Sequence, residues 1–531
     1  MAKHILSSGS SRARSSEGIQ VIKRLLSGVT TVGCAGLLCL PQAAFSQQAP
    51  RGDWSMTGNS PEQTGWQKAE RKLTPENASS KFQFLWKISL GSPAKARQTF
   101  DEPLLASRLI NAQGFKDFVY VTSSDTLYAV DSELGNLLWK KEFSIRKNAC
   151  GAPSVSVIME PPAVINFNAR RAPGTPAPAP APLLQPNERR IGVVAGGGGF
   201  GLKGIYAVTS DGMLHEQVLT TGVDFAPPVK FLAGAASPSA LNITGKKIYT
   251  ATSAACGAIP AGVSAVDMTS QDYPVEHYDL PKGGTLAGTG PVLGSDGTAY
   301  IVTGSGSAQS DFHANSVVAL GSDLKVKDWY TSSGAASPLS PTVFAYKGRQ
   351  IVVAAGKDGS LVLLDAASLG GADHHTALSE TPSISKGVKH GWDSLATWQE
   401  GDGTTWLLAS IAAPVSVASL KGSAAHGAVI AFRVDDADGK PVLTPAWMSG
   451  DMVNPAPARI ANGVVVALAG GNPTIHAKLS VLDAKTGKEL YSSKETIPTY
   501  TNKSGVAVGD SHAFFTDHNN VLYSFGIGLE H

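Results

Sequence analysis

The sequence predicts an all-β propeller of eight four-stranded antiparallel blades, and three observations support this fold. Charged residues make up only 16% of the 531 residues, and the chain contains 57 glycines and 32 prolines. This composition is typical of many short strands joined by tight turns. A unit of four short strands also recurs along the chain. A single sheet of four strands cannot bury both of its faces, so the copies are expected to pack around a common axis.

The clearest copy of the unit carries Ala129, Asp131, Gly135 and Trp139 at offsets 0, 2, 6 and 10. The aspartate opens a turn, the glycine adopts the left-handed conformation, and the next strand returns antiparallel. The tryptophan offers a large apolar surface to the neighbouring blade. Degenerate copies complete a set of eight, with third strands expected near Tyr128, Tyr206, Ser264, Val318, Leu363, Ile430, Val481 and Tyr523. The aromatic residues expected to dock between blades are Trp86, Trp139, Trp329, Trp447 and Tyr491.

The two ends of the chain are predicted to close the ring. The last unit lacks an outer strand, because the sequence stops soon after Tyr523. An unpaired strand, residues 82–90, lies near the other end and carries Trp86 at the docking position. We therefore expect this N-terminal strand to complete the last blade and to remove the open sheet edge.

The chain divides into three predicted segments. Residues 1–46 are expected to be a signal peptide, because Lys23 and Arg24 precede an apolar run and Ala44-Phe45-Ser46 offers small residues for cleavage. Residues 47–80 are an N-terminal extension, and residues 81–531 are the propeller, interrupted by a Pro/Ala-rich insert at 161–187.

Export would place the protein in the periplasm or outside the cell, with no membrane span in the mature chain. A permanent N-terminal anchor is the alternative. The predicted signal carries a net charge of +4 against +2 for the whole chain, which leaves the remainder at −2. This near-neutral remainder has no basic stripe, which argues against nucleic acid as a partner.

Because neighbouring strands run antiparallel, successive loops lie at opposite ends of the strands and so form two rims of the ring. Loops between second and third strands and between successive blades share one rim, here called the loop rim, and most are longer than a hairpin needs. The opposite turn rim carries tight turns. Long loops on a rigid scaffold commonly bind ligands, so we expect a small molecule or another exported protein to bind the loop rim.

Candidate ligand contacts there are Arg97, Glu102, His390, Trp392, Asp451 and Asn454, and the weak candidates for a catalytic base are Asp101 and Asp393. The alternative is that these polar residues only satisfy backbone groups at strand ends and that Trp392 packs between blades. No metal site is predicted, because the histidines show no short ligand spacing. Cys150 and Cys256 either form a disulfide or remain two separate buried thiols.

The frame from Ala129 to Trp139 resembles the repeat of the pyrroloquinoline quinone (PQQ) dehydrogenase-like propellers. The lead-in, with Asp53-Trp54-Ser-Met-Thr-Gly-Asn59, Leu73-Thr-Pro-Glu-Asn77 and Phe84-Leu-Trp86, is similar to that of quinoprotein alcohol dehydrogenases. In that superfamily the same propeller serves both enzymes and non-catalytic scaffolds. The chain lacks the adjacent cysteine pair of the enzymes and a Cys-x-x-Cys-His haem motif, and the calcium ligands of the enzymes find no match.

Residues 390–450 also resemble a group of exported bacterial propellers to which no reaction is assigned. The resemblance therefore implies a binding or scaffold module, for which no cofactor is expected. The alternative is a PQQ-dependent dehydrogenase that oxidises an alcohol or sugar, with PQQ and Ca²⁺ on the axis and Asp101 or Asp393 as the base. A lyase or hydrolase on the same frame is a third possibility.

Overall fold

The computed structural model describes residues 52–91, 100–111, 114–145, 154–159, 204–232, 238–255, 259–270, 272–304, 313–332, 339–356, 358–384, 392–501 and 505–528. The chain divides into two compact units, Met1–Ala49 and Pro50–His531. The first unit lies outside the described residues, as does the predicted signal peptide.

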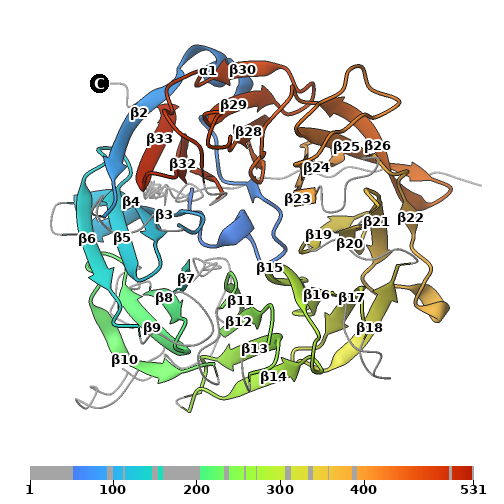
Figure 1. Cartoon of the computed structure of the whole chain (residues 1–531), viewed down its shortest axis with the longest axis horizontal. Coiled ribbons are helices and arrows are strands. Elements are labelled where there is room, and N and C mark those ends of the chain that lie inside the picture. Colours follow the sequence, from blue (N-terminus) through green and yellow to red (C-terminus); the bar gives the residue numbers. More distant parts are fainter. Residues whose placement is uncertain are drawn as a thin grey trace, which may run out of the picture. The chain divides into compact units, whose positions relative to one another are not determined.

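Within the described residues, the strands form eight antiparallel sheets arranged as blades around one axis (Figure 1). This confirms the predicted eight-bladed all-β propeller. Each of blades 1 to 7 uses four consecutive strands, from the axis outward. Blade 1 consists of β3 (Leu104–Asn111), β4 (Gly114–Thr122), β5 (Thr126–Asp131) and β6 (Leu137–Glu142), and blade 2 of β7 (Val155–Met159), β8 (Gly204–Thr209), β9 (Met213–Val218) and β10 (Asp224–Lys230). Blade 3 consists of β11 (Asn242–Thr244), β12 (Lys247–Thr252), β13 (Gly262–Asp267) and β14 (Val275–Asp279), and blade 4 of β15 (Leu286–Leu293), β16 (Ala299–Thr303), β17 (Ser316–Leu320) and β18 (Val326–Thr331).

The remaining blades follow the same order, with two additions from the N-terminal segment. The short strand β1 (Trp66–Gln67) pairs in parallel with the innermost strand of blade 7, and β2 (Phe82–Ser89) belongs to blade 8. Blade 5 consists of β19 (Thr342–Tyr346), β20 (Arg349–Ala355), β21 (Leu361–Asp365) and β22 (Ser379–Glu380), and blade 6 of β23 (Trp392–Gln399), β24 (Thr405–Ile411), β25 (Ala428–Ala437) and β26 (Lys440–Met448). Blade 7 contains β27 (Arg459–Ala461), β28 (Val464–Ala469), β29 (Lys478–Asp483) and β30 (Glu489–Ser492), and blade 8 contains β31 (Ala507–Gly509), β32 (His512–Thr516) and β33 (Val521–Ile527).

The N-terminal strand β2 closes the ring. It pairs antiparallel with β33 from Phe82 opposite Ile527 to Ser89 opposite Val521, and so forms the outer strand of blade 8. The expected closure by the two chain ends is confirmed. The exposed edge that β33 would otherwise present is covered.

Blade 2 corrects one strand assignment. The strand with Tyr206 is β8, which pairs with the innermost β7 and with β9, so it is the second strand of its blade and not the third. The third and outer positions are taken by β9 and β10, whose sequences lack the repeat residues. The segment 160–203, which includes the predicted insert, lies outside the described residues.

Tryptophans on outer strands contact the next blade around the ring through one geometry. Trp86 of blade 8 lies against Gly135, the turn glycine of blade 1, and its indole N–H donates to the carbonyl of Ser132 at 2.8 Å. A Cβ on Gly135 would come within 2.6 Å of the indole, so only glycine fits. Trp139 and Trp447 repeat this contact on Gly222 and Gly487.

Two further outer-strand aromatics reach their neighbours differently. Trp329 stacks between His313 and His374, with ring centroids 3.9 and 3.6 Å away. The longer segment after β21, with the 3-10 turn η2 (Gly371–Asp373), brings His374 there. Tyr491 packs edge-on against Phe82 of the closing strand at 5.0 Å. The docking positions thus lie between blades around the ring.

An N-terminal segment, residues 52–67, runs around the inside of the ring, and we call it the axial belt. It includes the 3-10 turn η1 (Thr57–Asn59) and strand β1, and the short helix α1 (Pro75–Ser80), capped by Thr74, follows it. The belt lies in the middle of the ring in Figure 1. Its hydrogen bonds reach the innermost strands in blade order, at Leu105, Met159, Asn242, Leu293, Val343, Thr397, Ile460 and Val508.

The belt also closes on itself. The amide of Gln67 donates to the carbonyls of Gly52 and Asp53 at 3.1 and 2.8 Å, so its two ends meet beside blade 8. Most belt contacts use backbone carbonyls, which need partners when buried. The extension is therefore an integral layer of the propeller. Among the described residues, no helix has the length and apolar character to cross a membrane.

Candidate functional site

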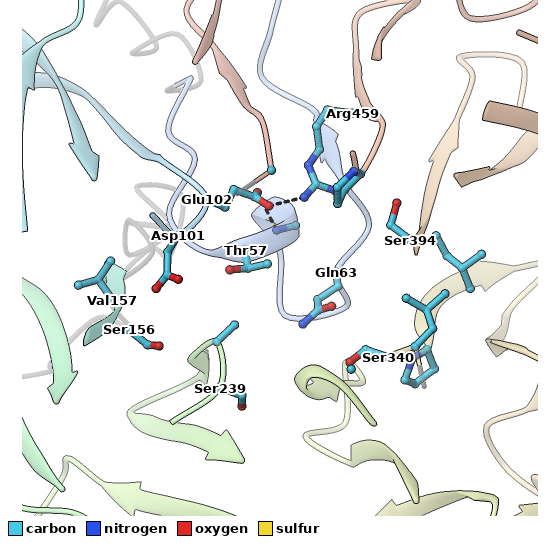
Figure 2. A pocket seen from close by; sticks show the side chains of 18 of the residues that line it. Thr57, Gln63, Asp101, Glu102, Ser156, Val157, Ser239, Ser340, Ser394 and Arg459 are labelled. Atoms are coloured by element: carbon cyan, nitrogen blue, oxygen red, sulfur yellow. Dashed lines mark hydrogen bonds and ion pairs between the residues drawn. The ribbon is translucent and has the colours of Figure 1, made fainter. Parts of the chain in front are cut away.

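A cavity of about 350 Å³ lies on the axis of the ring. Its walls come mainly from residues where innermost strands begin, which places it between the belt and the loop rim. The belt contributes Thr57, Gly58 and Gln63 (Figure 2). Its size falls within the range of small-molecule sites.

A buried ion pair crosses the floor of this cavity. Glu102, just before β3 of blade 1, pairs with the guanidinium of Arg459 on β27 of blade 7, and their side chains are 5% and 4% exposed. The other carboxylate oxygen accepts from the indole N–H of Trp54 at 2.7 Å and from the backbone N–H of Gly58 at 3.2 Å. The Arg459 guanidinium lies over the Trp54 ring at 5.5 Å and donates to the carbonyl of Val506. The pair therefore joins blades 1 and 7, which lie on either side of blade 8, and both partners also contact the belt.

Asp101, the residue before Glu102, has the opposite environment. Its side chain is exposed to the cavity and points toward Ser156 and Val157 of blade 2 (Figure 2). The surrounding protein reduces solvation of the carboxylate and raises the pKa of Asp101 to about 7, although a weak hydrogen bond from Thr122 at 3.4 Å opposes this and the charge of Glu102 adds to it. A carboxylate with this pKa can exchange a proton near neutral pH.

The rest of the lining is uncharged. The hydroxyl and amide side chains that face the cavity are Thr57, Gln63, Ser156, Ser239, Ser340 and Ser394. Leu339, Leu395 and several prolines supply the apolar surface. Such a wall can hydrogen-bond a neutral polar molecule and can also contact its carbon skeleton.

PQQ and Ca²⁺, which this fold class implies, do not fit the described lining. PQQ carries three carboxylates, and the cavity wall has one cationic side chain among the described residues, Arg459, which is already neutralised by Glu102. Calcium requires six to eight oxygen ligands, whereas both Glu102 oxygens are engaged by Trp54, Gly58 and Arg459. Asp101 is the remaining described carboxylate at the wall.

Among the other predicted site residues, two lie away from the cavity wall. Asp451 pairs with the imidazole of His426 at 2.6 Å and also accepts from its backbone N–H. This contact ties together two loops of blade 6. Asn454 donates to the carbonyl of Gly471 at 2.7 Å. Both residues hold loop conformations, and their contact with a ligand stays a prediction.

Several predicted residues cannot be placed. Arg97, His390, Cys150 and Cys256 lie outside the described residues, and so do the side chains of Trp392 and Asp393 on β23. The two alternatives for Cys150 and Cys256, a disulfide or separate thiols, therefore stay open, and the second candidate base stays a prediction.

Sequence reasoning missed Arg459 and the belt residues. A charged residue at the start of the short strand Arg459–Ala461, with apolar neighbours on both sides, was the available signal for a buried ion pair. The belt offered none, because its contacts are made largely by backbone groups.

The fold is an eight-bladed β-propeller with a cavity on its axis. It is similar to the crystal structure of quinohemoprotein alcohol dehydrogenase from Comamonas testosteroni, with 14% identity over 91% of this chain and 82% of that chain and a TM-score of 0.53. A quinohemoprotein alcohol dehydrogenase from Pseudomonas putida HK5 shares 12% identity over 90% of this chain and 81% of that chain, with a TM-score of 0.54. A europium-containing methanol dehydrogenase shares 13% identity over 90% of this chain and 98% of that chain, with a TM-score of 0.53. The TM-scores indicate a shared fold, and at 12–14% identity the similarity shows the fold alone.

No family model and no curated protein matches the sequence.

Proposed function

We propose that this propeller is a non-catalytic binding module whose axial cavity takes a small, uncharged, polyhydroxylated molecule. The observation that carries this proposal is the lining of the cavity. Its single described cation is neutralised by Glu102, and the other described polar groups are hydroxyls, one amide and Asp101. A carboxylate beside hydroxyls suits sugars and polyols, whose hydroxyl groups donate to it and also accept hydrogen bonds.

The belt supports binding on the axis from the loop rim. It fills the ring on the other side of the cavity and contacts all eight blades. A ligand would then meet a preformed floor, which reduces the ordering cost of binding.

Calorimetric titration with neutral mono- and disaccharides and polyols tests the proposal, with Asp101→Asn as the cavity variant. Asp451→Asn is the matched control, since Asp451 lies on a loop outside the cavity lining. We expect a ligand whose affinity falls about tenfold in Asp101→Asn, which is the cost of one hydrogen bond to a charged group. Equal loss in both variants, or no binding by any neutral compound, would overturn the proposal.

A quinoprotein dehydrogenase is the second candidate, and the raised pKa of Asp101 favours it because a base near neutral pH could accept a proton from an alcohol. Incubation with PQQ and CaCl₂ followed by gel filtration separates the two functions. Quinone absorbance that elutes with the protein, together with dye reduction on addition of alcohols, would establish the dehydrogenase. Loss of the quinone on the column supports the binding module.

We also propose that the protein is exported to the periplasm or the exterior of the cell. The support is the basic pair Lys23-Arg24, the apolar run after it and the small residues at Ala44 and Ser46. Intact-mass measurement of the protein recovered from the periplasmic or culture fraction tests this, with a mature chain that begins at Gln47 as the expected result. A full-length chain retained with the membranes would instead indicate the anchor.

A further inference from the structure

A cluster of three carboxyl groups lies where the ring closes, on the turn rim and away from the axial cavity. Asp117 is on β4 and Glu133 is in the turn after β5, both in blade 1, whereas Asp510 is in the turn between β31 and β32 of blade 8. One oxygen from each lies within 4.8 Å of the others. Each of the three residues is partly buried. Acidic groups at this spacing repel one another unless a proton or a cation lies between them.

A buried histidine lies beside Glu133 at the edge of this cluster. The side chain of His512, at the start of β32, is 2% exposed, and its Nε2 lies 3.7 Å from a Glu133 oxygen. That distance is too long for a hydrogen bond, and Nε2 has no hydrogen-bond partner among the described residues. The other ring nitrogen, Nδ1, lies 2.7 Å from the backbone carbonyl of Asp510. A carbonyl only accepts, so Nδ1 carries a proton, and in the neutral form of the ring Nε2 presents a lone pair.

This arrangement is the one found in metal-binding histidines. A ligating imidazole commonly donates its second N–H to a backbone carbonyl, which fixes the ring and its tautomer. The neighbouring hydroxyls of Ser132 and Ser511 are also buried without a hydrogen-bond partner among the described residues. Both adjoin cluster residues in the sequence. Buried polar groups without partners are rare in native proteins, and here three occur at one seam.

We propose that Asp117, Glu133, Asp510 and His512 bind a divalent first-row metal ion, such as Mn²⁺ or Zn²⁺, that fastens blade 1 to blade 8. Three carboxylates alone would suit Mg²⁺ or Ca²⁺, but an imidazole ligand shifts the preference to first-row transition metals. Oxygen atoms on opposite sides of one ion, at about 2.2 Å each, lie about 4.4 Å apart, so atoms within 4.8 Å of one another need only a small approach to share an ion.

The electrostatics of the seam are consistent with this assignment. The carboxylates of Asp117, Glu133 and Asp510 carry like charges at this spacing, and a dication between them would offset their repulsion.

The experiment uses the full chain, stripped with EDTA and dialysed, in calorimetric titrations and thermal melts with MnCl₂, ZnCl₂, MgCl₂ and CaCl₂. The test variant is Glu133→Gln, because this half-buried side chain can change without opening the core. The matched control is Glu142→Gln, an exposed carboxylate of the same blade that pairs with Lys140. A second variant, His512→Gln, tests the imidazole.

We expect one equivalent of Mn²⁺ or Zn²⁺ to bind wild type and Glu142→Gln and to raise their melting temperatures. Affinity should fall by about tenfold or more in Glu133→Gln, while its metal-free melting temperature stays at or above that of wild type because a repulsive charge is gone. Two results would overturn the proposal: no metal-dependent shift in wild type, or an equal shift in wild type and Glu133→Gln. If Mg²⁺ and Ca²⁺ raised the melting temperature as much as Mn²⁺ and Zn²⁺, the His512 imidazole would not be a metal ligand.

Discussion

Replacement of Glu102 by glutamine tests how the belt, blade 1 and blade 7 are held together. Glutamine has nearly the same shape as glutamate, so the change creates no cavity and leaves the apolar packing intact. It removes the negative charge and points an amide N–H₂ toward donors that need an acceptor. The Arg459 guanidinium, 4% exposed, then lies buried beside the axis without a counter-charge.

The expected loss is large because the partner cannot lose its proton. A guanidinium stays charged at any pH at which proteins fold, so its burial without a carboxylate costs about 3–5 kcal/mol of unfolding free energy. The hydrogen bonds from Trp54 and Gly58 to the carboxylate become weaker as well, since a neutral acceptor replaces a charged one.

Equilibrium urea unfolding followed by tryptophan fluorescence measures this loss. In Arg459→Met the buried Glu102 carboxyl can take up a proton, so that variant should lose less than Glu102→Gln. The double variant should lose less than the sum of the two single changes, with a coupling of about 0.5–3 kcal/mol. Glu142→Gln, at an exposed ion pair, should change little. A loss below about 1 kcal/mol in Glu102→Gln, the usual value for a surface pair, would refute the reasoning.

Three other changes test the docking geometry and the cavity. In Gly135→Ala, the new Cβ would lie 2.6 Å from the docked indole. The free energy of unfolding should fall by about 1–3 kcal/mol more than in Gly439→Ala, where the glycine has a similar positive φ but open space around it. Equal losses in urea unfolding would show that the indole contact is not responsible. Trp447→Phe removes the 2.9 Å indole hydrogen bond to the Ala484 carbonyl and should cost about 1 kcal/mol plus the lost ring area, whereas an unchanged melting temperature would contradict the proposed contact. The folded-state pKa of Asp101 is raised, so stability from its protonated form is complete below about pH 4 and is lost as pH rises through about 7. Asp101→Asn should therefore match wild type in melts at acidic pH and exceed it at pH 8, and a constant difference across this range would rule out Asp101 as the titrating group.

Much of the ring was predictable because its signal repeats. The frame of Asp131, Gly135 and Trp139 recurs with side chains that each have one mechanical role, so the blades could be counted from residues alone. Blade 2 was misassigned because its turn glycine, Gly222, lacks the preceding aspartate and the following tryptophan. The geometry of that turn is set by the Trp139 indole of the preceding blade, which a local pattern does not reveal.

The site was less predictable, because it depends on pairs that are remote in sequence. Asp101 and Glu102 are adjacent and chemically alike, and nothing local says that one faces a cavity while the other is buried. The difference arises from Arg459, 357 positions away from Glu102, together with Trp54 from the belt. The belt itself contacts the blades through carbonyls such as those of Ser55 and Pro61, which every residue possesses.

The belt shows how an N-terminal segment can change the axis of a propeller. A propeller axis is lined by the ends of eight strands, so any segment laid along it changes the size, charge and depth of the central cavity without altering a single blade. Here residues 52–67 fill part of the axis, supply Thr57 and Gln63 as cavity wall, and engage Glu102 and, through it, Arg459. The charges of Glu102 and Arg459, which could otherwise bind a ligand, are paired with each other within the protein. The chemistry of the axis is therefore determined by the N-terminal segment as much as by the repeat, and similarity of the blades alone does not transfer an activity to this chain.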